Sequence, residues 1–154
     1  MANHHTRPVT TDDQAIWREL FNGYAAFYGA PMNDEIAQRV WQWLHDPEHV
    51  LEGIVVEDAA GQVVGFVHVR ACPRPLGGNE IGFLDDMFVD PAARGSGAAD
   101  ALFTALRELA ERRGWPAVRW VTQHFNERGR GFYDRYTNGP SDFILYHWAP
   151  ANSS

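Results

Sequence analysis

The feature that most constrains this chain is a strand that ends at a proline and continues through a glycine-containing loop directly into a helix. Residues 81–89 are apolar on both faces, which is typical of a strand buried on two sides. Pro91 turns the chain, and Gly95 and Gly97 precede a long amphipathic stretch. Such a connection leaves main-chain N–H groups of the helix N-terminus unpaired, with the positive end of the helix dipole behind them. Together with Arg94 it predicts a cradle for an anion such as pyrophosphate; the alternative is an ordinary strand-to-helix connection.

The two common nucleotide-binding loops do not account for this segment. The chain contains no lysine, so it lacks the Gly-x-x-x-x-Gly-Lys-Ser/Thr loop that binds nucleotide phosphates. Asp100 stands where the third glycine of the dinucleotide-binding motif would fall. The loop therefore predicts a different class of phosphate-containing ligand.

The remaining hydrophobic pattern predicts an α/β chain with a mixed sheet and helices on its faces. Strands are expected at residues 8–10, 51–57, 63–69, 81–89, 117–122 and 143–148. Helices are expected after a capping box at residues 11–14, from residue 33 or 34 to before Pro47, at residues 97–113 and at residues 127–136. The length of 154 residues predicts a single domain over residues 1–154, with residues 1–7 as a flexible tail.

Composition and charge exclude several classes of function. Thirteen basic residues against twenty acidic ones give a net charge of -7, which disfavours nucleic-acid binding and favours small cationic ligands. The single cysteine, Cys72, excludes an internal disulfide and a cysteine-based metal cluster. With no signal peptide and no apolar run long enough to span a membrane, we expect a cytoplasmic protein without membrane contact.

Several motifs together resemble one enzyme family. Residues 94–99 read Arg-Gly-Ser-Gly-Ala-Ala and match the Arg/Gln-x-x-Gly-x-Gly/Ala signature of the GCN5-related N-acetyltransferases (GNAT family), with Pro91 three positions earlier. Asn126 and the Phe-Tyr pair at residues 132–133 are similar to the segment that follows the next strand in that family. Residues 83–89, Phe-Leu-Asp-Asp-Met-Phe-Val, resemble a strand of the diamine and polyamine acetyltransferase branch.

The resemblance implies a GNAT-like acyl-CoA N-acyltransferase fold, in which a central, mostly antiparallel mixed sheet is flanked by about four helices. It also implies acetyl-CoA as the cosubstrate and no metal or redox cofactor. The coenzyme pyrophosphate would be held by a run of residues in the loop: Arg94, Gly95, Ser96, Gly97, Ala98 and Ala99. The main chain of Met87, Phe88 and Val89 would pair with the pantetheine arm, and one N–H there would polarise the thioester carbonyl. Asn126 would contact the same arm, and Tyr133 would lie near the sulfur.

Two carboxylates interrupt the otherwise apolar strand at residues 81–89. An alkyl amine is protonated at neutral pH and must lose a proton before it attacks a thioester, and a carboxylate can accept that proton. The resemblance gives Asp85 the role of this base, acting through water because aspartate is short, and Asp86 that of binding a second cationic group. Since neighbours on a strand point to opposite faces, we expect one of the two to face the substrate directly. The alternative is that one or both pair with arginines.

Other aromatic and imidazole groups have weaker assignments. Tyr133 could protonate the departing thiolate, or it could be a core aromatic. Tyr28 could form a wall of the acceptor site, although aromatic stripes are more often core. His68, like the other histidines in or near strands, is expected to be a packed or hydrogen-bonded group rather than a catalyst.

The sequence thus predicts an acetyl-CoA-dependent N-acetyltransferase that acts on a primary amine of a small, cationic, diamine- or polyamine-like acceptor. Alternative acceptors are an amino acid, an antibiotic or a protein N-terminus. An alternative of another class is a noncatalytic acyl-CoA-binding or sensing domain, which would have no use for Asp85 or Tyr133. The family often forms dimers, so a homodimer is one of the expected states.

Overall fold

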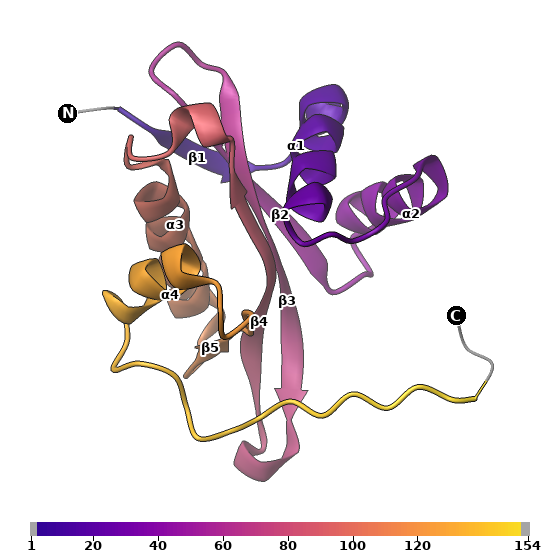
Figure 1. The fold of residues 1–154 in the computed structure, drawn as a ribbon, viewed down its shortest axis with the longest axis vertical. Helices are drawn as coiled ribbons and strands as arrows, with labels where there is room; N and C mark the ends of the chain where they lie inside the picture. Colours follow the sequence, from indigo (N-terminus) through magenta and orange to yellow (C-terminus); the bar gives the residue numbers. More distant parts are fainter. Residues whose placement is uncertain (1–2, 152–154) are drawn as a thin grey trace. The chain divides into compact units, whose positions relative to one another are not determined.

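The computed structural model describes residues 3–151, and those up to Trp120 form a mixed sheet with helices on both faces (Figure 1). The chain divides into two compact units, one that ends at Trp120 and one that begins at Val121. The prediction of a single domain over residues 1–154 stays a prediction. The mixed α/β class that the sequence predicted is confirmed.

Within the described residues five strands pair in the order β1-β2-β3-β4-β5. All neighbours are antiparallel except β4 and β5, which are parallel. The strands are β1 (His5–Pro8), β2 (Leu51–Glu57), β3 (Val63–Arg74), β4 (Asn79–Val89) and β5 (Val118–Arg119). The long β3–β4 hairpin is the central element of the sheet, and the candidate site lies along it.

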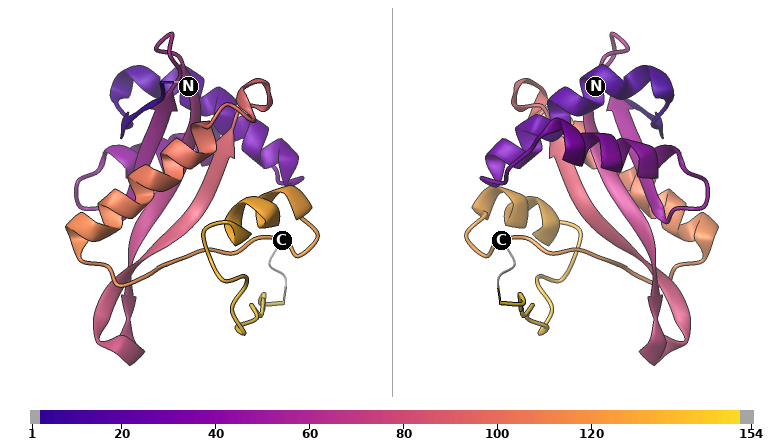
Figure 2. Two further views of the ribbon diagram at one scale, coloured as in Figure 1. Left: turned by 90° about the vertical axis from the view of Figure 1, so that its left-hand side faces the viewer. Right: turned by 90° about the vertical axis from the view of Figure 1, so that its right-hand side faces the viewer.

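Four α-helices follow the predicted amphipathic stretches. They are α1 (Gln14–Phe27), α2 (Asp34–His45), α3 (Ala98–Arg113) and α4 (Glu127–Asp134). Within the first unit, α1 and α2 cover one face of the sheet and α3 covers the other (Figure 2). The Asn33 side chain accepts a hydrogen bond from the Ile36 N–H at the start of α2, and Gly114, with φ of 68°, ends α3.

Each face of the sheet buries its own hydrophobic layer. The layer on the α1 side contains aromatic and aliphatic side chains from helices and strands: Trp17, Leu20, Phe21, Ala37, Trp41, Val55, Phe66 and Phe88. On the other side α3 buries apolar residues against the sheet: Leu102, Phe103, Leu106 and Leu109. A sheet covered on both faces explains why the strand predicted at residues 81–89 carries apolar residues on both sides.

The N-terminal part of the chain differs from the prediction. The first strand spans His5–Pro8 rather than residues 8–10, because these residues pair with β2, so the expected flexible tail is wrong for residues 5–7. Residues 1–2 of that tail lie outside the described residues. The capping box is formed by Thr10 and Asp13, one residue earlier than predicted, and the Thr10 N–H donates to Asp13 Oδ2 at 2.7 Å.

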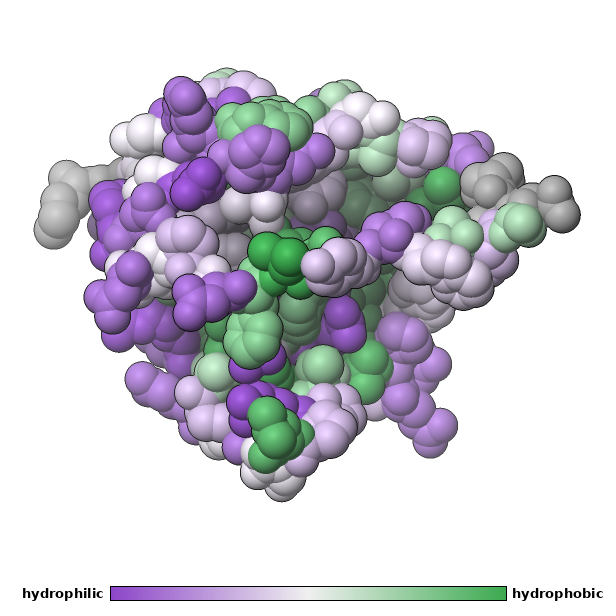
Figure 3. Space-filling model, turned by 60° about the horizontal axis from the view of Figure 1, so that its bottom comes forward, coloured by the Kyte–Doolittle hydropathy of each residue, from purple (hydrophilic) through white to green (hydrophobic). Residues whose placement is uncertain are grey.

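The C-terminal part also differs. The strand predicted at residues 117–122 is reduced to Val118–Arg119, and residues 143–148 form no strand within the described part of the chain. A strand requires a paired neighbour, and a pattern of apolar residues does not supply one. Large apolar side chains of this segment are exposed: Phe143, Ile144, Leu145, Tyr146 and Trp148. Apolar side chains are visible among polar ones on the face of the molecule drawn in Figure 3.

Candidate active site

A β-bulge in the middle of the β3–β4 hairpin decides the geometry of the two aspartates. On β3, Arg70 lies opposite Phe83 and His68 lies opposite Asp86. The chain therefore takes two steps between these positions on β3 and three on β4, so β4 carries one extra residue. The extra residue interrupts the alternation of side chains. As a result, Asp85 bonds to Arg70 and Asp86 bonds to His68, two side chains on the same face of β3. The prediction that the two carboxylates point to opposite faces is therefore wrong.

Asp85 is a half-buried carboxylate with one arginine partner. The Arg70 Nε–H donates to Asp85 Oδ2 at 2.9 Å, and the Tyr24 hydroxyl lies 3.4 Å from the main-chain oxygen of Asp85. Burial raises the pKa of the Asp85 carboxyl; Arg70 opposes this shift, and the neighbouring Asp86 adds to it. The pairing with an arginine, which the sequence left as an alternative, is present at Asp85. Its role as a base stays a prediction.

Asp86 belongs to a chain of hydrogen bonds that enters the core. His68 Nδ1 lies 2.8 Å from Asp86 Oδ2, and the Trp17 Nε1–H donates to His68 Nε2 at 3.0 Å. The His68 side chain is 1% exposed and that of Asp86 23%. The rings of Trp17 and His68 are therefore enclosed, whereas the Asp86 carboxylate is partly exposed to solvent.

The edge of β4 that faces β5 provides main-chain groups beside these carboxylates. β5 pairs with β4 only at Gly82 and Phe83, so within the described residues the following part of β4 has no strand on that side. This part includes Met87, Phe88 and Val89, the residues expected to pair with the pantetheine arm. An open edge of this kind can accept an extended ligand as an added strand.

The loop after β4 has the geometry predicted for an anion cradle. Gly95 and Gly97 have φ of 80° and 98°, a conformation that favours glycine, and a Cβ on Gly95 would meet open space. Gly97 is the N-cap of α3, and no side chain caps this helix among the described residues. The Arg94 guanidinium lies 5.8 Å from the ring centroids of both Phe27 and Phe88.

The second unit contains Asn126 and Tyr133. Asn126 is the N-cap of α4: its side chain accepts from the Gly129 N–H at 3.2 Å and donates to Thr122 Oγ1 at 3.0 Å. Tyr133 lies within α4, with its ring centroid 5.7 Å from that of Phe132. The helix predicted at residues 127–136 is confirmed over Glu127–Asp134, and the roles of these two side chains stay predictions.

Comparison with known proteins identifies the family. The sequence profile of the Acetyltransferase (GNAT) family matches residues 16–137. The chain belongs to the GNAT family. This span includes most of α1, the β3–β4 hairpin and the glycine loop, so the candidate site lies within the matched region.

Individual relatives are similar over nearly the whole chain. The D-amino-acid N-acetyltransferase HPA3 of Saccharomyces cerevisiae is 28% identical over 141 residues, which cover 91% of this chain and 87% of that protein. A ribosomal-protein-alanine N-acetyltransferase from Brucella melitensis biovar Abortus 2308 has a TM-score of 0.76 at 25% identity, covering 96% of this chain and 99% of that one. An aminoglycoside N-acetyltransferase, AAC(6')-Iy, in a structure with CoA, has the same fold, with a TM-score of 0.79 at 16% identity and coverage of 97% and 96%.

The GNAT protein described here is thus an acetyl-CoA-dependent N-acetyltransferase. Its glycine loop fits the coenzyme, because the open space at Gly95 and the uncapped start of α3 allow a pyrophosphate to approach main-chain N–H groups. Among the described residues no group of three or more histidine, cysteine or carboxylate side chains could hold a metal ion. None of the described helices is long and apolar enough to cross a membrane.

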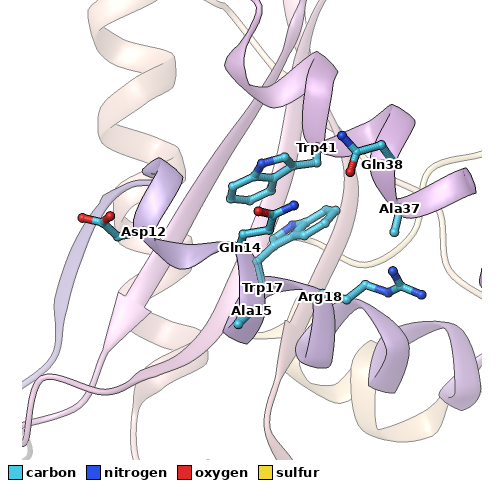
Figure 4. Close-up of a pocket in the computed structure, with 8 residues that line it drawn as sticks. All are labelled: Asp12, Gln14, Ala15, Trp17, Arg18, Ala37, Gln38 and Trp41. Atoms are coloured by element: carbon cyan, nitrogen blue, oxygen red, sulfur yellow. The ribbon is translucent and has the colours of Figure 1, made fainter. Parts of the chain in front are cut away.

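Tyr28 and a nearby pocket lie on the α1 side of the sheet. Tyr28 is the C-cap of α1, and its ring centroid is 4.9 Å from that of Tyr24 and 5.0 Å from that of Phe27. A pocket of about 470 Å³ lies nearer the start of α1 and is lined by residues of α1, α2 and the preceding turn: Asp12, Gln14, Ala15, Trp17, Arg18, Ala37, Gln38 and Trp41. In Figure 4 the indoles of Trp17 and Trp41 lie close together with the Gln14 side chain beside them, while the Asp12 carboxylate points away. Neither aspartate of β4 lines this pocket.

Sequence reasoning missed three residues of the site: Trp17, His68 and Arg70. His68 was expected to be packed or hydrogen-bonded, which is confirmed, but its partners were not foreseen. The available signal was the pair of successive strands predicted at residues 63–69 and 81–89, because pairing of neighbouring strands brings polar residues of one opposite polar residues of the other. The register that makes these pairs depends on the bulge.

Proposed function

We propose that this GNAT enzyme transfers the acetyl group directly from acetyl-CoA to a primary amine of a small, cationic acceptor of the diamine or polyamine type. The observation that carries the proposal is the presence of two carboxylates, Asp85 and Asp86, on one face of the sheet beside the open edge of β4. The net charge of -7 supports a cationic acceptor.

In this mechanism Asp85 is the base. The amine nitrogen attacks the thioester carbon after its proton passes to Asp85, directly or through a water. The raised pKa of Asp85 suits this role, because a carboxyl with a pKa nearer neutrality is a better proton acceptor. One main-chain N–H among Met87, Phe88 and Val89 would polarise the thioester carbonyl. The carbon–nitrogen bond forms and the carbon–sulfur bond breaks. Tyr133 gives a proton to the thiolate and regains one from the acylated nitrogen, directly or through water, so that the products are an N-acetylated amine, CoA and the proton held by Asp85.

The other predicted residues would hold the substrates. The loop from Arg94 through Gly95, Ser96, Gly97 and Ala98 to Ala99 would bind the pyrophosphate, and Asn126 would contact the pantetheine arm. Asp86 would bind a cationic group of the acceptor, and Tyr28 would form part of the acceptor wall. These assignments rest on the match of the residues to the family motif, with the loop between β4 and α3 and with Asn126 as the N-cap of α4.

A second candidate acceptor is an amino acid. Arg70 lies on the same face as the two aspartates with its side chain 38% exposed, and a guanidinium suits a carboxylate. The relative from Saccharomyces cerevisiae is named a D-amino-acid N-acetyltransferase. A polyamine has no carboxylate for Arg70 to bind, so the two candidates differ in their dependence on this residue.

The test is thiol release from acetyl-CoA by the purified protein with a panel of amines: putrescine, spermidine, D- and L-amino acids, aminoglycosides and short peptides. We expect saturable release with putrescine or spermidine. Saturable release with amino acids alone would replace the proposed acceptor by the second candidate. Binding of acetyl-CoA without release with any amine would favour a noncatalytic acyl-CoA-binding protein.

A matched pair of variants separates binding from chemistry. Arg94→Ala should weaken binding of acetyl-CoA, measured by calorimetry, because it removes a fixed charge from the loop. Tyr133→Phe should slow transfer while acetyl-CoA binds with nearly unchanged affinity, because it removes only the proton donor. An unchanged rate in Tyr133→Phe would remove the role assigned to this tyrosine.

A further inference from the structure

We propose that Trp17 and His68 are positioning residues, which hold Asp86 as a fixed anion for the ammonium group of the acceptor. The inference rests on the proposed function for the identity of the ligand, an amine. The arrangement of the three side chains rests on the structure alone. Asp86 is the group that touches the acceptor, and His68 and Trp17 act through it.

The Trp17 indole determines which nitrogen of His68 carries the proton. The Trp17 Nε1–H lies 3.0 Å from His68 Nε2, and an indole nitrogen can only donate a hydrogen bond. His68 Nε2 must therefore carry a lone pair. The proton of the neutral imidazole then resides on Nδ1, which lies 2.8 Å from Asp86 Oδ2 and donates to it. The partner of each nitrogen thus selects one tautomer.

Trp17 is 2% exposed and His68 1%, so water cannot easily replace either partner. Adding a proton to His68 Nε2 would place two N–H donors against each other inside this enclosed site. The indole bond therefore keeps the lone pair on Nε2 and the proton on Nδ1.

The His68 ring faces Asp86 on β4, and Asp85 is next to Asp86. On β3, the strand of His68 itself, the nearest charged group is Arg70. The α1 helix packs Trp17 and Phe21 against it, with the Phe21 ring centroid at 5.2 Å. Asp86 is thus the group that faces Nδ1, and the Trp17 N–H is the group that faces Nε2.

The consequence concerns the charge of Asp86. Arg70 already neutralises Asp85 in part through a direct ion pair at 2.9 Å. A cationic His68 would do the same to Asp86, and the site would lose its attraction for an ammonium group. A neutral His68 instead orients the carboxylate and leaves its charge available to the ligand. Among the described residues Asp86 has no side-chain hydrogen bond besides the one to His68.

The primary test is ¹⁵N NMR of the histidine ring nitrogens in the full-length protein, with His68→Asn used to assign the His68 signals. We expect a protonated Nδ1 and an unprotonated Nε2 in the wild type from pH 6 to pH 8. In Trp17→Phe we expect the spectrum to show a mixture of the two neutral tautomers, because Nε2 no longer accepts the indole hydrogen bond. Phe21→Leu is the matched control, because it shortens another α1 ring against His68 without removing a hydrogen bond, and its spectrum should follow the wild type.

The second readout is the KM for the acceptor at pH 6 and pH 8, with putrescine and D-alanine as probe amines. We expect KM at both pH values to rise about tenfold in Trp17→Phe relative to the wild type, with a smaller change in kcat. His68→Leu should raise KM at both pH values. His68→Asn should restore most of the loss, because the asparagine amide can donate to Asp86 in place of Nδ1.

Two results would overturn the proposal. One is a wild-type spectrum in which Nε2 is protonated at pH 7, and the other is a Trp17→Phe protein with the tautomer and KM of the wild type. These outcomes are distinct from failure of the proposed function. If neither probe amine is acetylated, the function as proposed is wrong, whereas the spectrum still decides whether Trp17 selects the His68 tautomer.

Discussion

Two of the arginine–aspartate pairs among the described residues, Arg7 with Asp13 and Arg70 with Asp85, differ in what surrounds them. The Asp13 carboxylate, at the start of α1, accepts hydrogen bonds from two Arg7 guanidinium nitrogens, at 2.7 and 2.9 Å, and from the Thr10 N–H at 2.7 Å. Asp85, on β4, receives a single bond from the Arg70 Nε–H at 2.9 Å. The Asp13 side chain is 6% exposed and that of Asp85 30%.

The two carboxyl groups shift in opposite directions. Hydrogen bonds from Arg7 lower the pKa of Asp13 although its burial opposes this shift. Burial raises the pKa of Asp85, because one bond from Arg70 does not compensate for the desolvation and for the nearby Asp86. The number of donors, rather than the presence of an arginine, separates a carboxylate that stabilises the fold from one that can exchange a proton.

The largest expected effect is on catalysis at Asp85. Asp85→Asn removes the proposed proton acceptor, so we expect the rate of acetyl transfer to fall by about 10²- to 10⁴-fold. Stability should change little, because a carboxyl with a raised pKa contributes no stabilisation by being ionised at neutral pH. Steady-state kinetics and urea unfolding of the same protein test both parts. An unchanged rate would remove Asp85 from the mechanism.

The next effect is on stability at Asp13. Asp13→Asn leaves Arg7 without its main partner in a nearly buried site, so we expect unfolding free energy to fall by about 2–4 kcal/mol. Because the pKa of Asp13 is lowered, its stabilisation is present above the pKa of an unfolded aspartate, about 3.9, and is lost as pH falls further. Urea unfolding between pH 3 and pH 7 should show this loss of stability at acid pH in the wild type and a weaker loss in the variant. Equal stability at pH 7 would show that the two pairs do not differ.

A smaller effect is expected at Arg70. Arg70→Gln removes the group that lowers the pKa of Asp85, so this pKa should rise further. The proposed base must be ionised, and the acid limb of the pH–rate profile should therefore move to higher pH. At the acid end of this profile we expect the rate to fall about fivefold, which corresponds to about 1 kcal/mol, after allowing for solvent exposure of the pair. A limb that moves to lower pH would contradict this account.

The smallest effect is expected at a third pair, Arg113 with Glu52, which joins α3 to β2 at 2.6 Å. Its side chains are 43% and 35% exposed, so solvent screens the interaction. Glu52→Gln should change unfolding free energy by about 0.5 kcal/mol or less, with no effect on the rate. A loss comparable to that of Asp13→Asn would show that exposure does not separate these pairs.

Local patterns were sufficient for much of the fold and for the coenzyme loop. The amphipathic stretches of α1, α2 and α3 and the hairpin of β2 with β3 were predicted from the spacing of apolar residues. The loop at residues 94–99 was predicted from its glycines and its place between a strand and a helix, and Gly95 and Gly97 do adopt the conformation that glycine favours. These features depend on neighbours in the chain, which the sequence displays directly.

The arrangement of the two aspartates was decided by the tertiary structure. Simple alternation placed Asp85 and Asp86 on opposite faces, and a bulge of one residue in the β3–β4 pairing brought them to the same face. Trp17 reaches His68 across fifty-one positions of the sequence because α1 packs on β3. The residue types, and with them the available chemistry, were readable from the chain. Which polar groups meet depends on strand register and helix packing, and these are set by the free energy of the whole core rather than by any one segment.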